Sequence, residues 1–239
     1  MKRRFGTSPI ASITLVLMVT LCVLSAGCGK TKETRIRPEV AGEKIALPAP
    51  LSDDGMPLNE ALERRRSQRS FTEGELRLEQ VSQLLWAAQG VTEPSQGFRT
   101  APSAGALYPL ELYVLEKGVL YHYIPASHSM EVVSKGVDAG RLTDAAARQQ
   151  FVAQAPAVFV IGAVFERTRA KYGDRADRYV YMEAGHAAQN LLLEAVSLGL
   201  GAVSVGAFDD RTTRDVLTLP ADVRPLYLIP VGYPAGQRQ

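Results

Sequence analysis

The spacing of apolar residues predicts helices in three parts of the chain. Helical spacing covers 58–66, 78–90 and about 179–198. The second of these segments places its apolar residues on one face: Val81, Leu84, Leu85 and Ala88. Gly90 is suited to end that helix, because a glycine commonly follows the last helical residue.

Short apolar runs between these helices predict strands. Two of the runs lie close together and predict a hairpin across Glu116, Lys117 and Gly118, and three more predict further strands. The runs cover 110–115, 119–124, 156–165, 199–208 and 226–234. Helices and strands do not alternate regularly, so the pattern predicts an α+β fold and not a parallel sheet of βαβ units.

The N-terminus has the pattern of an export signal. Lys2, Arg3 and Arg4 precede an uncharged apolar run over 10–24. That run is shorter than the roughly 18 to 20 residues that span a bilayer as a helix. We therefore expect residues 1–27 to be a signal peptide that is removed on export.

The segment LSAGC at the end of this region resembles the lipobox of bacterial lipoproteins. In that family the cysteine, here Cys28, is lipidated and becomes the mature N-terminus; Ser25 stands where an aliphatic residue is usual. Because Cys22 lies in the removed part, Cys28 would be the only mature cysteine and no intrachain disulfide could form. The resemblance implies a membrane-anchored lipoprotein on the periplasmic or extracellular face. Ordinary signal-peptide cleavage, which would release a soluble protein, is the alternative.

Residues 28–55 are charged and contain prolines without a sustained apolar period, so we expect them to be a flexible tether. Residues 56–239 are expected to be one enzyme-sized domain. A formal net charge of +2 gives no reason to expect a nucleic-acid partner. With three histidines and one mature cysteine, the chain has few ligands for a metal site. No histidine follows Ser204, so a hydrolase triad in that order is excluded.

An arginine cluster stands where the first predicted helix ends. Its members are Arg64, Arg65, Arg66 and Arg69, with Ser67 and Ser70 between and after them. Guanidinium groups this close repel one another unless an anion joins them, and phosphate is their usual bidentate partner. The alternative is a solvated group of cations that complements the negative end of the helix dipole.

The segment TAPSAGALYPL, residues 100–110, favours neither a helix nor a strand, because prolines bracket four tiny side chains. Small side chains allow a close approach of the backbone to something large. That partner could be a neighbouring helix or a bound ring system.

Six blocks of the sequence together resemble the nitroreductase superfamily, most closely its SagB/ThcOx-type dehydrogenases. The blocks are RRSQRSF, LLWAAQGVT, RTAPSAGALYPLELYVL, GVLYHYIP, KYGDRADRYVYMEAGHAAQNLLLEAVSLGLGAVSVGAFDD and PLYLIPVGYP. They occur in the order and spacing of that family, over about residues 56–234. The resemblance implies a nitroreductase-like α+β fold with a mainly antiparallel central sheet flanked by helices. It also implies a homodimer with an FMN in each of two interface sites.

The resemblance also implies roles for individual residues. Arg65, Arg66, Ser67 and Arg69 match positions that bind the FMN phosphate and ribityl chain. Three residues match the loop against the isoalloxazine ring, namely Pro102, Ser103 and Ala104. Three more match the segment across its other side, Val205, Gly206 and Ala207, where the N–H of Gly206 would donate to flavin N5. Arg238 matches a further phosphate contact.

Lys171 and Tyr172 match a pair that lies over the flavin and handles the proton in the peptide-oxidising relatives. The alternative is a solvated loop in which Lys171 pairs with Asp174. A second polar set, Glu183, His186, Gln189 and Asn190, falls near one face of the long helix. It is expected to be a self-satisfied structural set at the dimer interface, with a catalytic set as the alternative.

Together these features predict an FMN-dependent oxidoreductase held at a bacterial membrane. Its substrate would be a small molecule or a peptide; the SagB/ThcOx-type relatives oxidise azoline rings in ribosomal peptides. The alternative is a non-catalytic lipoprotein that keeps the fold and binds flavin or assists assembly.

Overall fold

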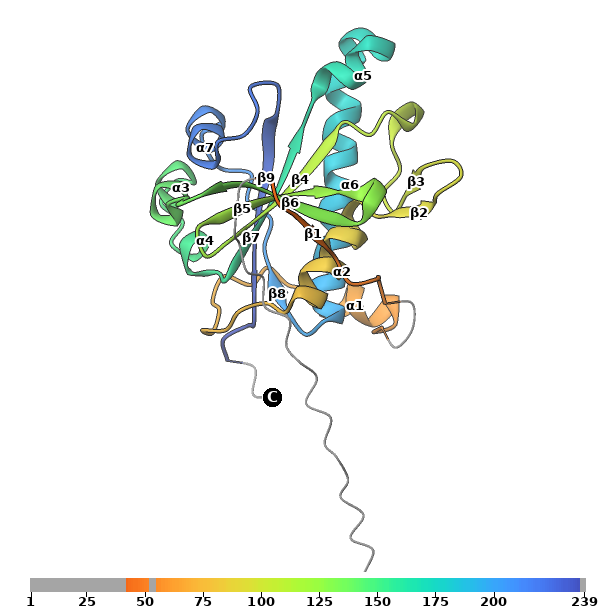
Figure 1. Ribbon diagram of the computed structural model, residues 1–239. Helices are drawn as coiled ribbons and strands as arrows, with labels where there is room; N and C mark the ends of the chain where they lie inside the picture. The colour runs from red at the N-terminus through yellow and green to blue at the C-terminus, as the bar shows by residue number, and fades with distance from the viewer. Residues whose placement is uncertain (1–41, 52–54, 237–239) are drawn as a thin grey trace, which may run out of the picture. The chain divides into compact units, whose positions relative to one another are not determined.

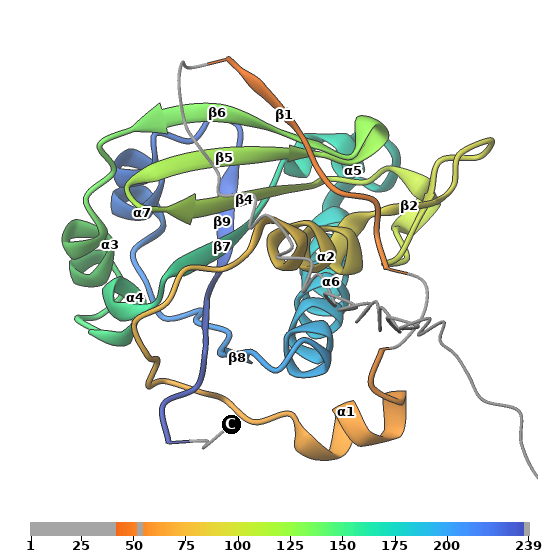
Figure 2. The same ribbon diagram turned by 60° about the horizontal axis from the view of Figure 1, so that its bottom comes forward.

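The computed structural model describes residues 42–51 and 55–236. Its centre is a seven-stranded sheet in the order β1-β6-β5-β4-β7-β9-β8, in which each neighbouring pair of strands is antiparallel (Figures 1 and 2). The strands are β1 (Lys44–Ala46), β4 (Leu110–Glu116), β5 (Val119–Ile124), β6 (Ser129–Lys135), β7 (Ala157–Ala163), β8 (Gly201–Ala202) and β9 (Arg224–Gly232). A separate ribbon pairs β2 (Val91–Glu93) with β3 (Phe98–Arg99).

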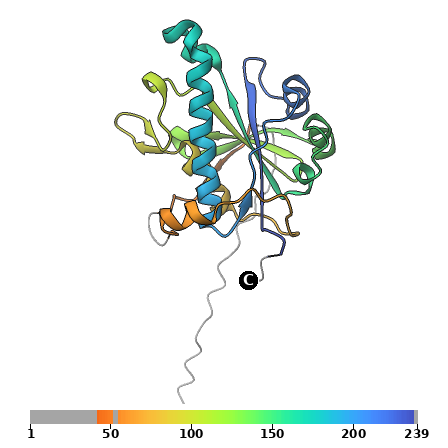
Figure 3. The same ribbon diagram turned by 180° about the vertical axis from the view of Figure 1, so that it is seen from behind.

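Helices cover both faces of this sheet, as Figures 1 and 3 show. They are α1 (Leu58–Arg64), α2 (Leu78–Gln89), α3 (Ala139–Ala145), α4 (Phe151–Gln154), α5 (Phe165–Tyr172), α6 (Ala176–Ser197) and α7 (Asp210–Leu217). Three short 3-10 turns lie between elements: η1 (Ala104–Ala106) between β3 and β4, η2 (Pro125–Ser127) between β5 and β6, and η3 (Gly173–Arg175) between α5 and α6. The predicted α+β fold with a mainly antiparallel sheet between helices is confirmed.

Two hydrophobic cores lie on opposite faces of the sheet. On one face, side chains of α2 and α6 such as Leu84 and Leu191 pack with Phe159. On the other face, side chains of α3, α4 and α7 pack with Val158 and Leu228. Every residue of β7 is buried, which explains why this strand has a continuous apolar run instead of alternation.

Most of the predicted elements are found, with shifted ends. The predicted helix over 58–66 ends at Arg64, and the long helix begins earlier, at Ala176. The predicted strand over 199–208 is wrong in length: only Gly201–Ala202 is a strand, followed by an isolated bridge between Val205 and Leu228.

The predicted boundary at residue 56 also needs correction. Lys44–Ala46 forms an edge strand paired with β6, and Leu47 after it is buried, so folded structure begins inside the segment 28–55 expected to be a tether. Backbone pairing at a sheet edge requires no apolar periodicity, which is why this strand was not predicted. The predicted signal peptide 1–27, Cys28 and Arg238 lie outside the described residues. None of the helices in the described ranges is long and apolar enough to cross a bilayer.

Candidate functional site

The chain leaves α1 as an extended segment that runs beside β8. Ser67 forms a parallel bridge with Ala202, and the Gln68 N–H donates to the carbonyl of Ala202 at 3.0 Å. Gly201 permits this approach, because a β-carbon there would lie 2.8 Å from that of Gln68. The arginine cluster is thereby fixed against the sheet and not left on a free helix end.

Two of the arginines serve the end of α1. Arg64 forms an ion pair with Glu60 one turn earlier, at 2.5 Å. Arg66 donates from Nη1 to the carbonyls of Glu63 and Arg65 at 2.7 and 2.8 Å, which satisfies acceptors left over at the helix end. The contacts of Arg64 and Arg66 therefore fit the alternative in which the arginines complement the end of the helix.

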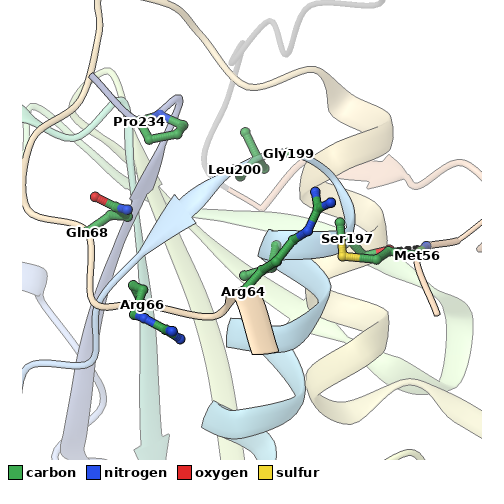
Figure 4. Close-up of a pocket in the computed structure, with 9 residues that line it drawn as sticks. Met56, Arg64, Arg66, Gln68, Ser197, Gly199, Leu200 and Pro234 are labelled. Atoms are coloured by element: carbon green, nitrogen blue, oxygen red, sulfur yellow. Dashed lines mark hydrogen bonds between the residues drawn. The ribbon is translucent and has the colours of Figure 1, made fainter. Parts of the chain in front are cut away.

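A pocket of about 180 Å³ lies beside these side chains (Figure 4). Residues from α1, the extended segment and the end of α6 line it, among them Arg64, Arg66, Gln68 and Ser197. Successive side chains of extended backbone point to opposite sides. Since Arg66 and Gln68 line this pocket, Arg65, Ser67 and Arg69 face away from it. Arg66 is thus separated from the other three predicted phosphate ligands.

Arg65 and Arg69 are available to an anion. Within residues 42–51 and 55–236, neither guanidinium has a carboxylate partner. The guanidinium of Arg69 lies 5.8 Å from the centre of the Phe151 ring, which orients it without neutralising its charge. Ser67 is exposed and adds a hydroxyl donor.

The segment Val205–Ala207 lies near this group. Val205 exchanges backbone hydrogen bonds with Leu228 at 2.8 and 3.0 Å, and the carbonyl of Ala207 accepts from Gln149 at 3.3 Å. Gly206 is exposed, and its N–H donates to no backbone carbonyl among the described residues. Gln149 is two residues before Phe151, the first residue of α4, so the stretch 149–151 contacts both this segment and Arg69. One part of the site therefore combines Arg65 and Arg69, which have no carboxylate partner in the described part of the chain, with the Gly206 N–H, which has no backbone acceptor there.

The loop of small residues has a strained backbone. Gly105, Ala106 and Tyr108 have φ of +63°, +55° and +45°, a region that L-residues rarely adopt. Two hydrogen bonds hold Tyr108: its N–H donates to Ser103 Oγ at 2.9 Å, and its carbonyl accepts from Arg167 at 3.1 Å. The guanidinium of Arg99 lies 4.3 Å from the centre of the Tyr108 ring. This set of contacts holds the loop in a shape that its sequence alone would not favour.

Lys171 and Tyr172, the last residues of α5, lie against this loop. A β-carbon on Gly105 would lie 2.8 Å from Lys171 Nζ and 2.8 Å from the Tyr172 hydroxyl. The pair ends α5 instead of lying in a solvated loop, and the Tyr172 ring packs edge-on against Tyr179 with 5.0 Å between ring centres. Lys171 has no ion pair with Asp174 or with another carboxylate of the described part. The structure thus brings the predicted catalytic pair onto the predicted ring-facing loop.

Buried polar groups support the loop from beneath. Arg99 donates to Gln89 Oε1 at 3.0 Å, and burial lowers the pKa of Arg99 below its ordinary value. The Ser103 hydroxyl lies near the carboxyl of Glu183 on α6 and favours its ionised form. Burial raises the pKa of Glu183 to about 7, against the opposing effects of Ser103 and Arg99. Asn190 donates to the carbonyl of Thr100 at 3.3 Å. Glu183 and Asn190 therefore act within one chain, on the segment that carries the loop.

A second charged group was not predicted from the sequence. Glu111 binds His122 at 2.5 Å and forms an ion pair with Arg167, the residue that also holds the carbonyl of Tyr108. Burial would raise the pKa of Glu111, but the hydrogen bonds from His122 and Arg167 outweigh it and lower that pKa below its ordinary value. The alternation of residues in β4 could place Glu111 on one face of the sheet, but no local pattern in the sequence indicates that Arg167 on α5 is its partner.

The two parts of the site are far apart within one chain. Ser103 lies near Glu183, whereas Ser197 near the other end of α6 lines the pocket beside Arg66. At about 1.5 Å per residue, these levels of α6 lie about 20 Å apart. Figures 1 and 3 likewise show α5 at one end of α6 and α1 at the other.

Comparisons with known proteins identify the class to which this fold and site belong. Residues 62–233 match the nitroreductase family. A nitroreductase-family protein of Methanocaldococcus jannaschii is 48% identical over 182 residues, which are 73% of this chain and 90% of that protein. The chain belongs to the nitroreductase family, whose members are flavin-dependent oxidoreductases.

Two further relatives agree with this assignment. A crystal structure of a nitroreductase-family protein from Ralstonia eutropha JMP134 has a TM-score of 0.74 at 32% identity, over 85% of this chain and 97% of that one. The microcin B17-processing protein McbC of Escherichia coli is 28% identical over 173 residues, which are 63% of this chain and 60% of McbC. The nitroreductase fold is thus supported by both sequence and structure.

Proposed function

We propose that this protein is an FMN-dependent oxidoreductase of the SagB/ThcOx type that works as an exported, lipid-anchored homodimer. One observation carries the proposal: Arg65 and Arg69, which have no carboxylate partner among the described residues, lie near Gly206, whose N–H donates to no backbone carbonyl there. A flavin mononucleotide needs cations for its phosphate and a backbone donor near its ring. Arg65 and Arg69 do not line the pocket beside Arg66, and the stretch 149–151 contacts both Arg69 and Ala207 next to Gly206, so the residues fit the cofactor. When bound, FMN would supply hydride transfer at N5.

A homodimer is proposed because the two parts of the site lie about 20 Å apart along α6. The arginine part and the Ser103 loop would meet across a subunit interface, each contributed by a different copy. Exposed apolar side chains on α1 and α6, among them Leu58, Leu62 and Met182, fit burial in such an interface.

Lys171 and Tyr172 are proposed to handle the proton that accompanies hydride transfer. Lys171 has no carboxylate partner among the described residues, so no ion pair holds its amino group away from the loop at Gly105. The Tyr172 hydroxyl lies equally close to Gly105 and can relay that proton or hold the substrate. The similarity to McbC, whose name states that it processes microcin B17, favours a peptide substrate over a small molecule.

Export and anchoring are proposed from the first 28 residues of the sequence, with Cys28 as the lipidated residue. An exported flavoprotein must obtain FMN outside the cytoplasm or be exported loaded. The second candidate function is a lipoprotein that keeps the fold without turnover, and the contact of Lys171 and Tyr172 with the loop argues for the enzyme.

Reconstitution with FMN tests the proposal. The purified protein is incubated with FMN, dialysed and examined for the visible absorbance of bound flavin. Candidate electron donors, including azoline-containing peptides, are then added without oxygen. We expect one FMN per chain and bleaching of the flavin by at least one donor. Absence of bound flavin after reconstitution would overturn the proposal, and bound flavin that no donor bleaches would favour the non-catalytic alternative.

A further inference from the structure

The end of the small-residue loop is bound by the first turn of α5. Val164, the residue before α5, donates its N–H to the carbonyl of Pro109 at 2.8 Å. Three residues further on, Arg167 donates from Nη1 to the carbonyl of Tyr108 at 3.1 Å. Two consecutive carbonyls are therefore bound by one helical turn, so the backbone at 108–109 is fixed relative to α5.

The same helix contacts the loop again one turn later. Residues four apart lie on the same face of a helix, so Lys171 faces the same side as Arg167. Lys171 Nζ and the Tyr172 hydroxyl each lie 2.8 Å from the position of a β-carbon on Gly105. The segment 105–109 thus runs beside α5 in the opposite direction. The contact at Arg167 sets the register in which Lys171 meets the loop.

Arg167 is itself fixed to the sheet. Its Nη2 forms an ion pair with Oε1 of Glu111 on β4, and Nε2 of His122 on β5 binds the other carboxylate oxygen at 2.5 Å. Burial opposes the ionised form of Glu111, but the bonds with His122 and Arg167 outweigh it and lower the pKa of Glu111 below its ordinary value. The guanidinium of Arg167 therefore faces a carboxylate that is held at both oxygens.

One planar guanidinium makes both contacts of Arg167, to the carbonyl of Tyr108 from Nη1 and to the carboxylate of Glu111 from Nη2. A lysine carries the same charge on a single nitrogen, at the end of a side chain one bond shorter. It can keep the ion pair but cannot bridge the two acceptors in this geometry. Tyr108 needs a restraint, because its φ of +45° is rarely adopted and such conformations persist only when their surroundings hold them.

We propose that Arg167 is a positioning residue for Lys171 and Tyr172. By bridging the carbonyl of Tyr108 and the carboxylate of Glu111, it fixes the loop against α5 and so sets where the two reactive groups stand. Arg167 itself takes no part in proton transfer. The inference rests on the proposed function only in giving Lys171 and Tyr172 a role in the reaction.

Four forms of the protein test the bridge: the wild type, Arg167→Lys, Arg167→Gln and Arg169→Lys. Arg167→Lys keeps a cation beside Glu111 and loses the bridge, whereas Arg167→Gln loses both. Arg169→Lys is the matched control. Arg169 also lies on α5 and is ion-paired, but with Glu166 of the same helix and Asp177 of α6 instead of a residue that holds the loop.

Hydrogen exchange of the protein without FMN measures the loop directly. The N–H groups of Ala106 and Tyr108 donate to Ser103 within the loop, so mass spectrometry of peptides covering 103–108 follows its opening. We expect exchange to be about tenfold faster or more in both Arg167 variants, as for the loss of one hydrogen bond to a charged group. Exchange in Arg169→Lys should match the wild type.

Urea unfolding of the same proteins separates the bridge from simple charge balance. The free energy of unfolding should fall less in Arg167→Lys than in Arg167→Gln, because only the lysine keeps a cation beside Glu111. Stability is thus restored by lysine, whereas the closure of the loop is not. Exchange in Arg167→Lys equal to that in the wild type would overturn the proposal. If Arg167→Gln does not fold, the exchange of Arg167→Lys alone decides.

Reduction of the bound flavin separates this inference from the proposed function. With a donor that bleaches the wild-type flavin, Arg167→Lys should lower the limiting rate at saturating donor by about tenfold or more, with a smaller change in the half-saturating donor concentration. If exchange follows Arg167 while the wild type binds no FMN, the hold on the loop stands and the proposed function fails. If a donor bleaches the wild-type flavin but Arg167→Lys matches the wild type in exchange and rate, the positioning role fails and the proposed function stands.

Discussion

Lys171 Nζ lies 2.8 Å from the point that a β-carbon on Gly105 would occupy. The absence of a side chain at Gly105 therefore lets the end of α5 lie directly on the loop. The run of tiny residues that was expected to lie close to a helix or a bound ring has at least this partner within its own chain. The same contact holds the proposed catalytic pair next to the proposed ring-facing surface.

Gly105→Ala should change both stability and reactivity. The substitution forces an L-residue to a φ of +63°, which costs about 1 to 2 kcal/mol, and it displaces Lys171 and Tyr172. Gly97→Ala is the matched control, because Gly97 has a φ of +70° with nothing within 4 Å. Urea unfolding should show a similar loss in both variants, whereas slower flavin reduction should appear only in Gly105→Ala. Equal rates in the two variants would contradict a role for this contact.

Lys171→Ala and Tyr172→Phe should each slow substrate oxidation by about 10²-fold or more, because each removes a group proposed to handle the proton. FMN content and dimerisation should not change. Stopped-flow bleaching of the bound flavin measures the rate. Lys135→Ala serves as control, since Lys135 is an exposed lysine at the end of β6. Full turnover in the double variant would show that the pair has no catalytic role.

Arg65→Ala and Arg69→Ala should each weaken FMN binding by about tenfold or more, as expected for loss of one charge-assisted bond to a phosphate. The free energy of unfolding should stay nearly constant, because surface charges that form no ion pair among the described residues contribute little to it. Arg64→Ala should retain FMN, since Arg64 pairs with Glu60 and lines the opposite side. Quenching of FMN fluorescence gives the affinities. A loss in Arg64→Ala equal to that in Arg69→Ala would refute the assignment of sides.

The elements predicted from the sequence are those with a strong local pattern. The buried strand β7 and the long helix α6 are found because their apolar residues repeat at short spacing. The predicted strand over 199–208 fails for a non-local reason. Val203 donates to the carbonyl of Pro230 on β9, but a proline has no N–H to return the bond, so β8 ends at Ala202.

The parts of the candidate site were predictable to different degrees. Resemblance to a family located the arginine cluster and the small-residue loop, but not the division of Arg66 from Arg65 and Arg69, which depends on the backbone direction after α1. The contacts of Arg99 with Tyr108 and of Arg167 with Glu111 join different elements of the fold. No periodicity within one segment indicates such pairs.

Cys28→Ala should abolish membrane association without changing FMN binding by the folded domain. Acyl chains on Cys28, and not the polypeptide that follows, are proposed to hold the protein to lipid. Cys22→Ala is the matched control, because Cys22 lies in the segment expected to be removed. Membranes are washed with carbonate and the protein remaining is measured. Equal recovery of Cys28→Ala and the wild type would indicate an uncleaved anchor or a protein receptor.

Glu183 and Glu116 should make the protein less stable as the pH rises. Burial raises the pKa of each to about 7, so between the ordinary carboxyl pKa and 7 the folded state binds more protons than the unfolded state. The free energy of unfolding therefore falls with rising pH in that window. Glu183→Gln and Glu116→Gln should each reduce the fall between about pH 5 and about pH 8 by about 2 kcal/mol, measured by urea unfolding. A pH dependence identical to that of the wild type in either variant would show that its carboxyl titrates normally.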